Sequence, residues 1–401
     1  MLGRFVRKFG FVSAVSIFAA SAVQAVILFS TGDPSANTTA PTGDLSGSGW
    51  QYEGYWGGFA GTPIAPNFFI SAHHIGQAGS VFTFQGVDYH LVPTGDSNNP
   101  YVNFEDPFSD LIIWQVMETF PTFAPLYSTG DEVGKHLVVI GHGTERGTDV
   151  TINGTLRGWN WGQPDGAQRW GENIVSQIVP DPDLRAFLYA TFDQNGLPSE
   201  AHLSAGDSGG GVFLQDNNGV WKLAAINYGV DGPFYTDASG DGQFLAALFD
   251  ARDLYYQDQT NPPHYTLISG TDPVPTGFYS TRISSCLDWI YSAIDPTGDA
   301  DGNGIPNLLQ YALDLNSPFA QGYGPTQGGF SPGTASLTYR KITTATQLQY
   351  EVEQSTDLVT WTPVTTQDQV VDTRGNVQTI QANVAVGANT SLFLRLRITQ
   401  Q

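Results

Sequence analysis

The chain has 401 residues, with 46 Gly, 24 Pro, a single Cys and 12% aromatic residues, and its formal net charge is −22. This composition favours many short strands joined by turns over a helical bundle. The acidic balance argues against nucleic acids and anionic membranes as partners, because both carry negative charge. The lone cysteine, Cys286, excludes an intrachain disulfide, and we expect it to be a buried structural thiol.

Residues 1–25 are typical of a secretory signal peptide. Arg4, Arg7 and Lys8 precede an apolar stretch at residues 9–23, and V-Q-A follows with a small residue at the expected cleavage site. The apolar stretch is shorter than the roughly 20 residues that a membrane span needs, and no later segment is long and apolar enough to span. The sequence therefore predicts an exported protein, extracellular or periplasmic, with no transmembrane segment.

Strand patterns begin near Trp50 and continue to about residue 280. Apolar runs at residues 67–72, 111–114 and 137–140 predict buried strands. Hairpins are predicted for residues 81–84 with 89–92 and, across N-N-G, for residues 211–214 with 220–226. Residues 244–255 have a weak helical pattern. Residues 284–294 predict a short helix, because Leu287, Ile290, Tyr291 and Ile294 share one face.

The C-terminal part differs in composition. An Asp-rich connector, residues 295–320, is followed by a Gly-, Pro- and Gln-rich stretch, residues 321–335, which predicts a linker. Alternating apolar residues at 337–342, 348–352 and 392–398 then predict a small all-β domain over residues 336–401.

The segment L-S-A-G-D-S-G-G-G-V-F, residues 203–213, places a serine between an aspartate and three glycines. Acyl transfer by a serine needs a base for the hydroxyl proton, a carboxylate that holds the base in one tautomer, and N–H donors for the oxyanion. Glycines let the backbone expose such donors. The alternative for this segment is a tight turn without chemistry.

Candidates for the base and the carboxylate lie upstream. His73 and His74 follow an apolar strand, and at most one of them faces a site, because successive side chains of an extended chain point to opposite sides. Asp110 opens the apolar run at residues 111–113, with Glu105 and Asp106 as alternatives. The histidines lack the H-x-x-x-H or H-x-x-E-H spacing of a zinc site.

Taken in chain order, these motifs resemble the chymotrypsin-like (trypsin-fold) serine proteases. The matching segments span about residues 50–294 and run from the approach to the histidine to the closing strand and helix. They are G-G-F-A-G-T-P-I-A-P (57–66), S-A-H-H (71–74), S-D-L-I-I (109–113), G-D-S-G-G (206–210), A-I-N-Y-G (225–229) and residues 277–290.

The resemblance implies a mostly β fold of two six-stranded antiparallel β-barrels with a C-terminal helix at residues 26–294, followed by the small all-β domain. It implies that Ser208 is the nucleophile, His74 the general base and acid, and Asp110 the residue that orients His74. Gly206 and Ser208 would supply the oxyanion-hole N–H groups. His202, Tyr228 and Gly229 would line the substrate pocket. No cofactor is implied for catalysis.

Two departures from the family bear on specificity and activation. His202 takes the place of the pocket floor, where an Asp would select Lys or Arg, so we expect non-tryptic specificity; a protonated His would favour acidic or polar side chains, and a neutral one would only pack. The stretch 231–275 is longer than the family's loop and is expected to cover the cleft. The I-V-G-G start is missing, but cleavage after Ala25 would expose Val26. Export would then create the amine that pairs with Asp207.

The connector and the last domain leave alternatives open. Asp299, Asp301 and Asn303 stand at alternate positions with Gly304 sixth, which resembles the calcium loop of EF-hand or dockerin-like repeats. Gln310 replaces the bidentate Glu at the twelfth position, so a plain linker is the alternative. The last domain resembles terminal domains of exported bacterial proteins at residues 355–363. Binding of a glycan or another surface, or a sorting role, are open for it.

The sequence as a whole predicts a secreted serine endopeptidase that acts on protein or peptide substrates. A catalytically silent protease-like binding protein is the main alternative. A surface-attachment protein and an esterase are two others.

Overall fold

The computed structural model describes residues 26–94, 96–164, 166–181, 183–258, 260, 262–299, 303–315, 326–343, 345, 348–387 and 391–400. The predicted signal peptide lies outside these residues. The chain divides into two compact units between Ser285 and Cys286. Within the described ranges, no helix combines the length and the apolar character that crossing a membrane requires.

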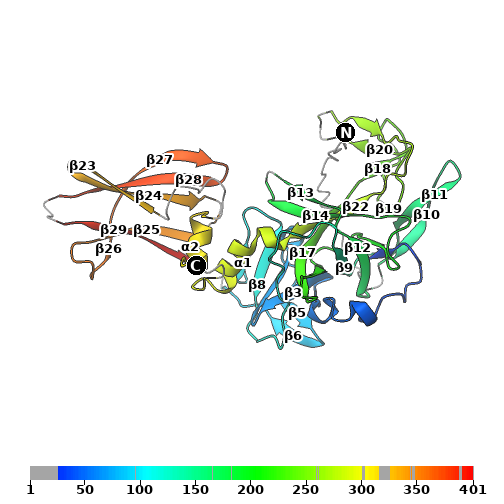
Figure 1. Ribbon diagram of the computed structural model, residues 1–401, viewed down its shortest axis with the longest axis horizontal. Helices are drawn as coiled ribbons and strands as arrows, with labels where there is room; N and C mark the ends of the chain where they lie inside the picture. Colours follow the sequence, from blue (N-terminus) through cyan, green and yellow to red (C-terminus); the bar gives the residue numbers. More distant parts are fainter. Residues whose placement is uncertain are drawn as a thin grey trace. The chain divides into compact units, whose positions relative to one another are not determined.

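Two seven-stranded antiparallel sheets make up most of the first unit (Figure 1). The first sheet surrounds an aromatic core that includes Trp56, Phe69 and Phe82. Its strands, in spatial order, are β6 (Val87–His90), β5 (Val81–Phe84), β2 (Gly54–Trp56), β3 (Phe59–Ala65), β4 (Phe68–Ala72), β8 (Leu111–Gln115) and β7 (Asn103–Glu105). The predicted hairpin at residues 81–92 is confirmed as β5 and β6, with its second strand starting two residues earlier than expected.

The second sheet has an aliphatic core that includes Val139, Leu188 and Val212. Its strands, in spatial order, are β12 (Arg169–Ile174), β9 (His136–Gly141), β16 (Gly211–Gln215), β17 (Trp221–Val230), β22 (Gly277–Arg282), β14 (Ala186–Thr191) and β13 (Gln177–Pro180). The hairpin predicted across N-N-G is confirmed as β16 and β17. Among the described residues each sheet has one strand more than the six predicted for each barrel.

Three small sheets complete this unit, and one of them corrects a prediction. Residues 244–255 are not helical: they contain the strand β19, which pairs with β11. Its residues are buried on both faces, and a short apolar run of this kind has no period that separates helix from strand. The small sheets are β10 (Arg146–Ile152), β11 (Thr155–Trp161) and β19 (Ala246–Leu248); β18 (Phe234–Tyr235), β20 (Tyr255–Gln257) and β21 (Tyr265–Leu267); and β1 (Ile27–Leu28) with β15 (Ala201–His202).

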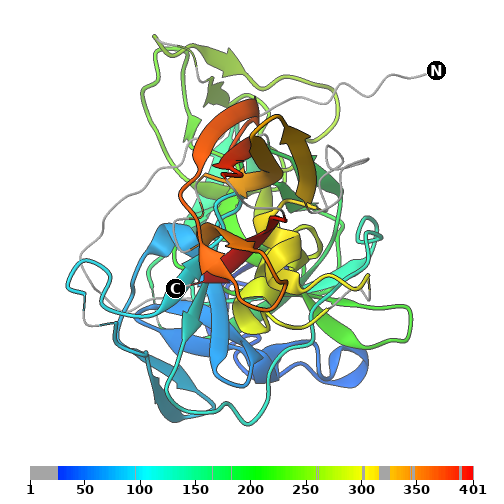
Figure 2. The ribbon, with the colours of Figure 1, turned by 90° about the vertical axis from the view of Figure 1, so that its left-hand side faces the viewer.

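The second unit begins with α1 (Leu287–Ile294) and α2 (Asn307–Ala312), which lie side by side (Figure 2). The predicted helix at 284–294 is confirmed, although it starts at Leu287, and Cys286 is buried. The all-β prediction is confirmed by two sheets: β23 (Thr326–Ser331), β24 (Thr334–Ile342), β28 (Val377–Ala385) and β27 (Gln367–Arg374); and β26 (Thr362–Pro363), β25 (Leu348–Ser355) and β29 (Phe393–Gln400).

The linker predicted at residues 321–335 needs a correction. Residues 321–325 lie outside the described part, but β23 occupies Thr326–Ser331 and pairs with β24 across Pro332-Gly333. Gly333 has a φ of 83°, and Pro followed by such a Gly is the signature of a tight turn. The Gly and Pro residues that suggested a linker therefore belong partly to a hairpin.

Candidate active site

The ladder between β4 and β8 brings His74 and Asp110 together. Ala72 pairs with Leu111 at the end of this ladder, so the residues just beyond it meet. The N–H of His73 donates to the carbonyl of Asp110 at 3.0 Å, and the N–H of His74 donates to Asp110 Oδ1 at 2.8 Å. A 3₁₀ turn, His73–Ile75, then places the His74 ring beside the carboxylate. Residues 36 apart in sequence are thus joined by strand register.

The His74 ring links Asp110 to Ser208. His74 Nδ1 lies 2.6 Å from Asp110 Oδ2, and its Nε2 lies 2.8 Å from Ser208 Oγ. An ionised carboxylate only accepts hydrogen bonds, so Nδ1 carries the proton and Nε2 presents its lone pair to the serine hydroxyl. The Asp110 side chain is nearly buried, whereas 27% of the His74 side chain is exposed. The geometry suits transfer of the Ser208 proton to His74.

The alternative residues named from the sequence have other partners. His73 Nε2 lies 3.5 Å from Glu105 Oε2 at the surface, and this contact raises the pKa of His73. Asp106 is buried and pairs with Arg185 at 3.1 Å. Of the two adjacent histidines, it is therefore His74 that contacts both an aspartate and a serine.

The glycines around Ser208 are required by close packing. Gly206 and Gly209 have φ values of 95° and 83°, which side chains rarely adopt. A Cβ on Gly209 would lie 2.4 Å from the carbonyl oxygen of Ala60, and one on Gly210 would lie 2.1 Å from that of Ile140. The loop therefore fits between the two seven-stranded sheets only with glycine at these positions.

Two N–H groups of this loop remain free for a ligand. Gly209 N–H donates to the carbonyl of Asn227 and Gly210 N–H to that of Asp207. In the described part of the chain, the N–H groups of Gly206 and Ser208 donate to no protein group. These are the two donors that the resemblance assigns to an oxyanion hole.

The carboxylate of Asp207 ties the loop that carries Ser208 to other parts of the first unit. It is buried and accepts hydrogen bonds from the N–H groups of Val26 (3.1 Å), Gly143 (2.7 Å) and Ser204 (2.8 Å). Burial raises the pKa of Asp207 to about 7, although the hydrogen bonds from Ser204 and Val26 act in the opposite direction. Val26, the first residue after the predicted signal peptide, thus contacts the loop that carries Ser208.

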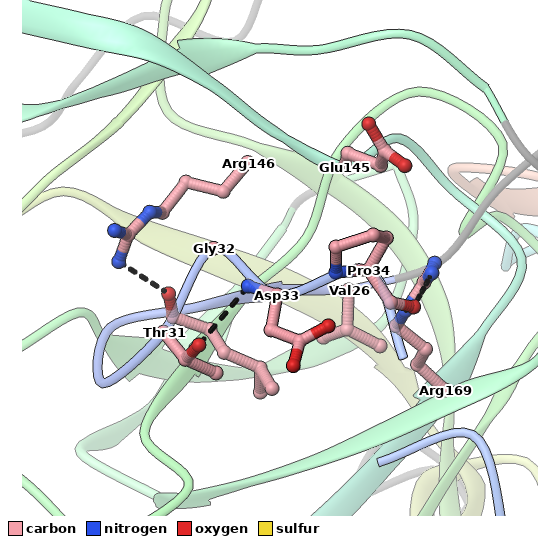
Figure 3. A pocket seen from close by; sticks show the side chains of 9 residues that line it. Val26, Thr31, Gly32, Asp33, Pro34, Glu145, Arg146 and Arg169 are labelled. Carbon is pink, nitrogen blue, oxygen red and sulfur yellow. Dashed lines mark hydrogen bonds between the residues drawn. The ribbon is translucent and has the colours of Figure 1, made fainter. Parts of the chain in front are cut away.

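The segment that follows Val26 is held in place by two arginines. Arg146 donates to the carbonyl of Phe29 at 2.9 Å, and its guanidinium lies 4.2 Å from the centre of the Trp159 ring. Arg169 donates to the carbonyl of Pro34. Between them lies a small pocket (Figure 3), lined by Val26, Leu28, Thr31, Gly32, Asp33, Pro34, Glu145, Arg146 and Arg169. These contacts fix the path of the chain toward Asp207.

The three predicted pocket residues lie in different surroundings. The Tyr228 ring packs edge-on against His74, with ring centres 5.5 Å apart, and Gly229 follows it in β17. His202 is fully buried against Phe192 and Phe278, and its Nδ1 lies 2.7 Å from the carbonyl oxygen of Leu203. Burial lowers the pKa of His202 to about 4. The neutral packing role is therefore the one that its surroundings favour.

The predicted calcium ligands lie in the second unit. Asp299 accepts hydrogen bonds from the N–H groups of Asn303 and Gly304, at 3.1 and 2.7 Å. Asn303 Nδ2 donates to Gln310 Oε1. Asp301 lies outside the described residues. Both of these N–H groups therefore point at the Asp299 carboxylate, and the carboxylate and amide oxygens present are of the hard type that calcium prefers.

Asn227 and Glu53 were not singled out from the sequence. Both are buried polar residues that contact the loop that carries Ser208: Asn227 donates to the carbonyl of Asp207, and Glu53 accepts from the N–H of Gly211 at 3.0 Å. An Asn inside the apolar run of β17 is a signal that could have been used. For Glu53 no local pattern predicts the contact.

Three solved protease structures are similar to parts of this chain. The active form of the Rv3671c protease from M. tuberculosis is 12% identical, with 72% of this chain and 97% of that chain covered and a TM-score of 0.34. The HtrA-type protease AlgW with a decapeptide is 14% identical, with 59% and 51% covered and a TM-score of 0.32. Kallikrein-related peptidase 10 with Zn²⁺ is 12% identical, with 64% and 98% covered and a TM-score of 0.33.

Comparison with models of known protein families and with curated proteins gives no match.

Proposed function

We propose that this protein is a secreted serine endopeptidase whose protease domain consists of two β-barrels of the trypsin type. The observation that carries the proposal is the hydrogen-bonded chain from Asp110 through His74 to Ser208, beside two N–H groups that find no acceptor among the described residues. Protein or peptide substrates follow from this class of reaction.

In the proposed reaction Ser208 Oγ attacks the carbonyl carbon of the scissile bond while His74 Nε2 takes its proton. Asp110 holds the Nδ1 proton and stabilises the imidazolium that forms. The N–H groups of Gly206 and Ser208 donate to the oxyanion of the tetrahedral intermediate. His74 then gives the proton to the leaving amine. A water molecule, deprotonated by His74, hydrolyses the acyl-enzyme and frees Ser208.

Export is proposed to activate the enzyme. Removal of residues 1–25 would turn the Val26 N–H, which already lies 3.1 Å from Asp207 Oδ1, into an α-amine. A charged amine at this place would pair with the buried carboxylate and fix the nucleophile loop. N-terminal sequencing of active protein tests this step: a start at Val26 is expected, and an active form that starts elsewhere would contradict it.

Specificity is proposed to be non-tryptic, because the neutral, packed His202 offers no negative charge to a Lys or Arg side chain. Cleavage of a peptide library is expected to show no preference for these residues. Efficient cleavage after them would refute this part of the proposal.

The second unit is proposed to be accessory. The loop around Asp299 would bind calcium, with Asp301 as a further ligand, and catalysis itself would need no cofactor. The last β domain would bind a glycan or another surface. Binding by the second unit alone, residues 286–401, compared with the whole chain, tests the second point.

The decisive experiment uses a fluorophosphonate probe on the mature protein and on its Ser208→Ala variant. Labelling of the wild-type chain that vanishes in the variant is expected, because the probe needs a nucleophile, a base and an oxyanion hole. Hydrolysis of a protein substrate by the same samples distinguishes an endopeptidase from an esterase. If a wild-type chain that starts at Val26 is labelled no more than the variant, the protein would instead be a silent binding protein.

A further inference from the structure

Asn227 in β17 is a fully buried polar residue without a part in the reaction just described. Its Nδ2 donates to the carbonyls of Ile140 and Asp207, at 2.9 and 3.1 Å. Its Oδ1 accepts a hydrogen bond from Ser280 Oγ at 3.3 Å. Because Nδ2 faces two carbonyl oxygens, the amide has one orientation only, and both of its N–H groups are used.

The backbone of Asn227 holds the same loop. Its N–H donates to the carbonyl of Gly210 at 2.8 Å, and its carbonyl accepts from the N–H of Gly209 at 3.1 Å. A Cβ on Gly210 would lie 2.9 Å from Asn227 Nδ2, so the second glycine after the serine also makes room for this amide. Asn227 therefore contacts the nucleophile loop at three separate residues.

The contact with the Asp207 carbonyl fixes a peptide plane. This oxygen accepts from Asn227 Nδ2 and from the N–H of Gly210 at 3.2 Å, which occupies both of its lone pairs. In a planar trans peptide the following N–H points away from the carbonyl oxygen. The N–H of Ser208 is therefore directed away from Asn227, and among the described residues it donates to nothing.

We infer that Asn227 is a positioning residue that aims the Ser208 N–H at the oxyanion by clamping the Asp207 carbonyl. The inference rests on the proposed function for its effect on rate. Without the amide, only the Gly210 N–H would hold this peptide. Gly206 and Gly209 on either side already adopt positive φ, so the loop has the backbone freedom to turn the peptide.

Asn173 provides a matched control. It is also buried, its Nδ2 donates to the carbonyls of Thr191 and Ala201 at 2.8 and 3.1 Å, and its Oδ1 accepts from the N–H of Ile174. Asn→Asp at either position keeps the shape and removes the same two donors. Asn173 makes no contact of this kind with residues 204–211. The Asn173→Asp variant therefore measures how much the loss of a buried amide lowers the rate wherever it lies in the protein.

The experiment compares Asn227→Asp and Asn173→Asp in the mature chain, by kcat and KM on a fluorogenic peptide and by the rate of fluorophosphonate labelling. One oxyanion donor is worth about 10²–10³ in kcat, so partial misorientation should lower kcat and labelling in Asn227→Asp by about 10- to 100-fold. KM should change less than about threefold. In Asn173→Asp both rates should stay within about threefold of wild type. Equal rate losses in the two variants, or a change in KM alone for Asn227→Asp, would overturn the inference.

A second readout does not depend on activity. Crystal structures of wild type and Asn227→Ser, a smaller change that also serves if Asn227→Asp does not fold, are expected to differ in the orientation of the peptide between Asp207 and Ser208. The same orientation in both would overturn the inference even for an inactive protein. A wild-type chain without labelling or hydrolysis would refute the proposed function instead, and the two failures are thereby separate.

Discussion

Two turns of this protein have nearly the same residue types and very different surroundings. A-G-D-S-G-G, residues 205–210, contains Ser208, and D-A-S-G-D-G, residues 237–242, contains Ser239. In the first turn, Asp207 is buried and accepts hydrogen bonds from residues 64 and 181 positions away. In the second, Asp237 is exposed and accepts hydrogen bonds from its near neighbours Ser239, Gly240 and Asp241.

The surroundings also shift the two carboxyl groups in opposite directions. Burial raises the pKa of Asp207, whereas hydrogen bonds from Ser239 lower that of Asp237. A serine hydroxyl among glycines and aspartates therefore also occurs in an exposed turn of this protein. It becomes a candidate nucleophile only where other elements bring a base and hold the backbone.

The largest effect is expected from removing the His74 ring beside Ser208; in the exposed turn the Ser239 hydroxyl donates to the carboxylates of Asp237 and Asp241 instead. His74→Ala should lower kcat by about 10⁴-fold or more, because nothing then takes the proton of Ser208. The adjacent His73→Ala, which loses only a surface contact with Glu105, should change kcat less than about threefold. Steady-state kinetics of both variants is the measurement. Similar losses in the two would mean that the histidine turn matters only for structure.

The next effect concerns the two aspartates. Asp207→Ala leaves several buried N–H groups without an acceptor and should lower the free energy of unfolding by about 2–5 kcal/mol. Asp237→Ala should change it by less than about 0.5 kcal/mol. Urea unfolding in a Ser208→Ala background, which prevents self-digestion, measures both. If Asp237→Ala lowered the free energy of unfolding as much as Asp207→Ala does, the two turns would not differ in the way described.

A pH-dependent effect is expected from Glu53, which supports the buried turn from the first sheet. Its Oε1 accepts from Thr62 Oγ1 and from the N–H of Gly211, and burial raises its pKa to about 8. In the unfolded chain the pKa of a Glu is about 4.3. Because folding raises the pKa of Glu53, the protonated side chain contributes its full stabilisation below about pH 4.3, and this contribution is lost as the pH rises toward 8.

Glu53→Gln stays neutral and keeps the acceptor oxygen. Between pH 5 and pH 8, the free energy of unfolding of the Ser208→Ala protein should therefore fall by on the order of 1–3 kcal/mol more than that of the same protein with Glu53→Gln. Urea unfolding at several pH values gives this difference. Parallel pH profiles would show that Glu53 does not titrate between folded and unfolded states in this range.

The smallest effect is expected at Asp299, whose carboxylate also accepts from near neighbours, the N–H groups of Asn303 and Gly304. If it binds calcium with a millimolar dissociation constant, 5 mM CaCl₂ should stabilise the protein by about 1 kcal/mol, and Asp299→Asn should abolish this gain. Thermal unfolding with CaCl₂ and with MgCl₂ is the measurement. An equal gain for the variant, or for both salts, would point to a general ionic effect.

Much of the fold and of the candidate site could be predicted before the structure. Strand patterns around Leu111 and Val212 were clear, because both runs are apolar throughout. The helical prediction for residues 244–255 is wrong, since the apolar run at 244–249 has no period, and β19 is a strand because β11 offers it an edge. The part of the predicted linker at Thr326–Ser331 became β23 for the same reason: a partner strand lies beside it.

The sequence by itself determined which chemical groups are present and in what order: a histidine after one apolar strand, an aspartate before another, and a serine among glycines. The glycines beside the serine were also visible in the sequence, but the close contacts that require Gly209 and Gly210, with Ala60 and Ile140, belong to the tertiary structure. Only the tertiary structure decided the contacts between His74, Asp110 and Ser208 and the burial of His202. It alone placed Asn227 and Glu53 against the same loop. Such contacts join residues far apart in the chain, and the pairing and packing of whole strands set them, which no local pattern encodes.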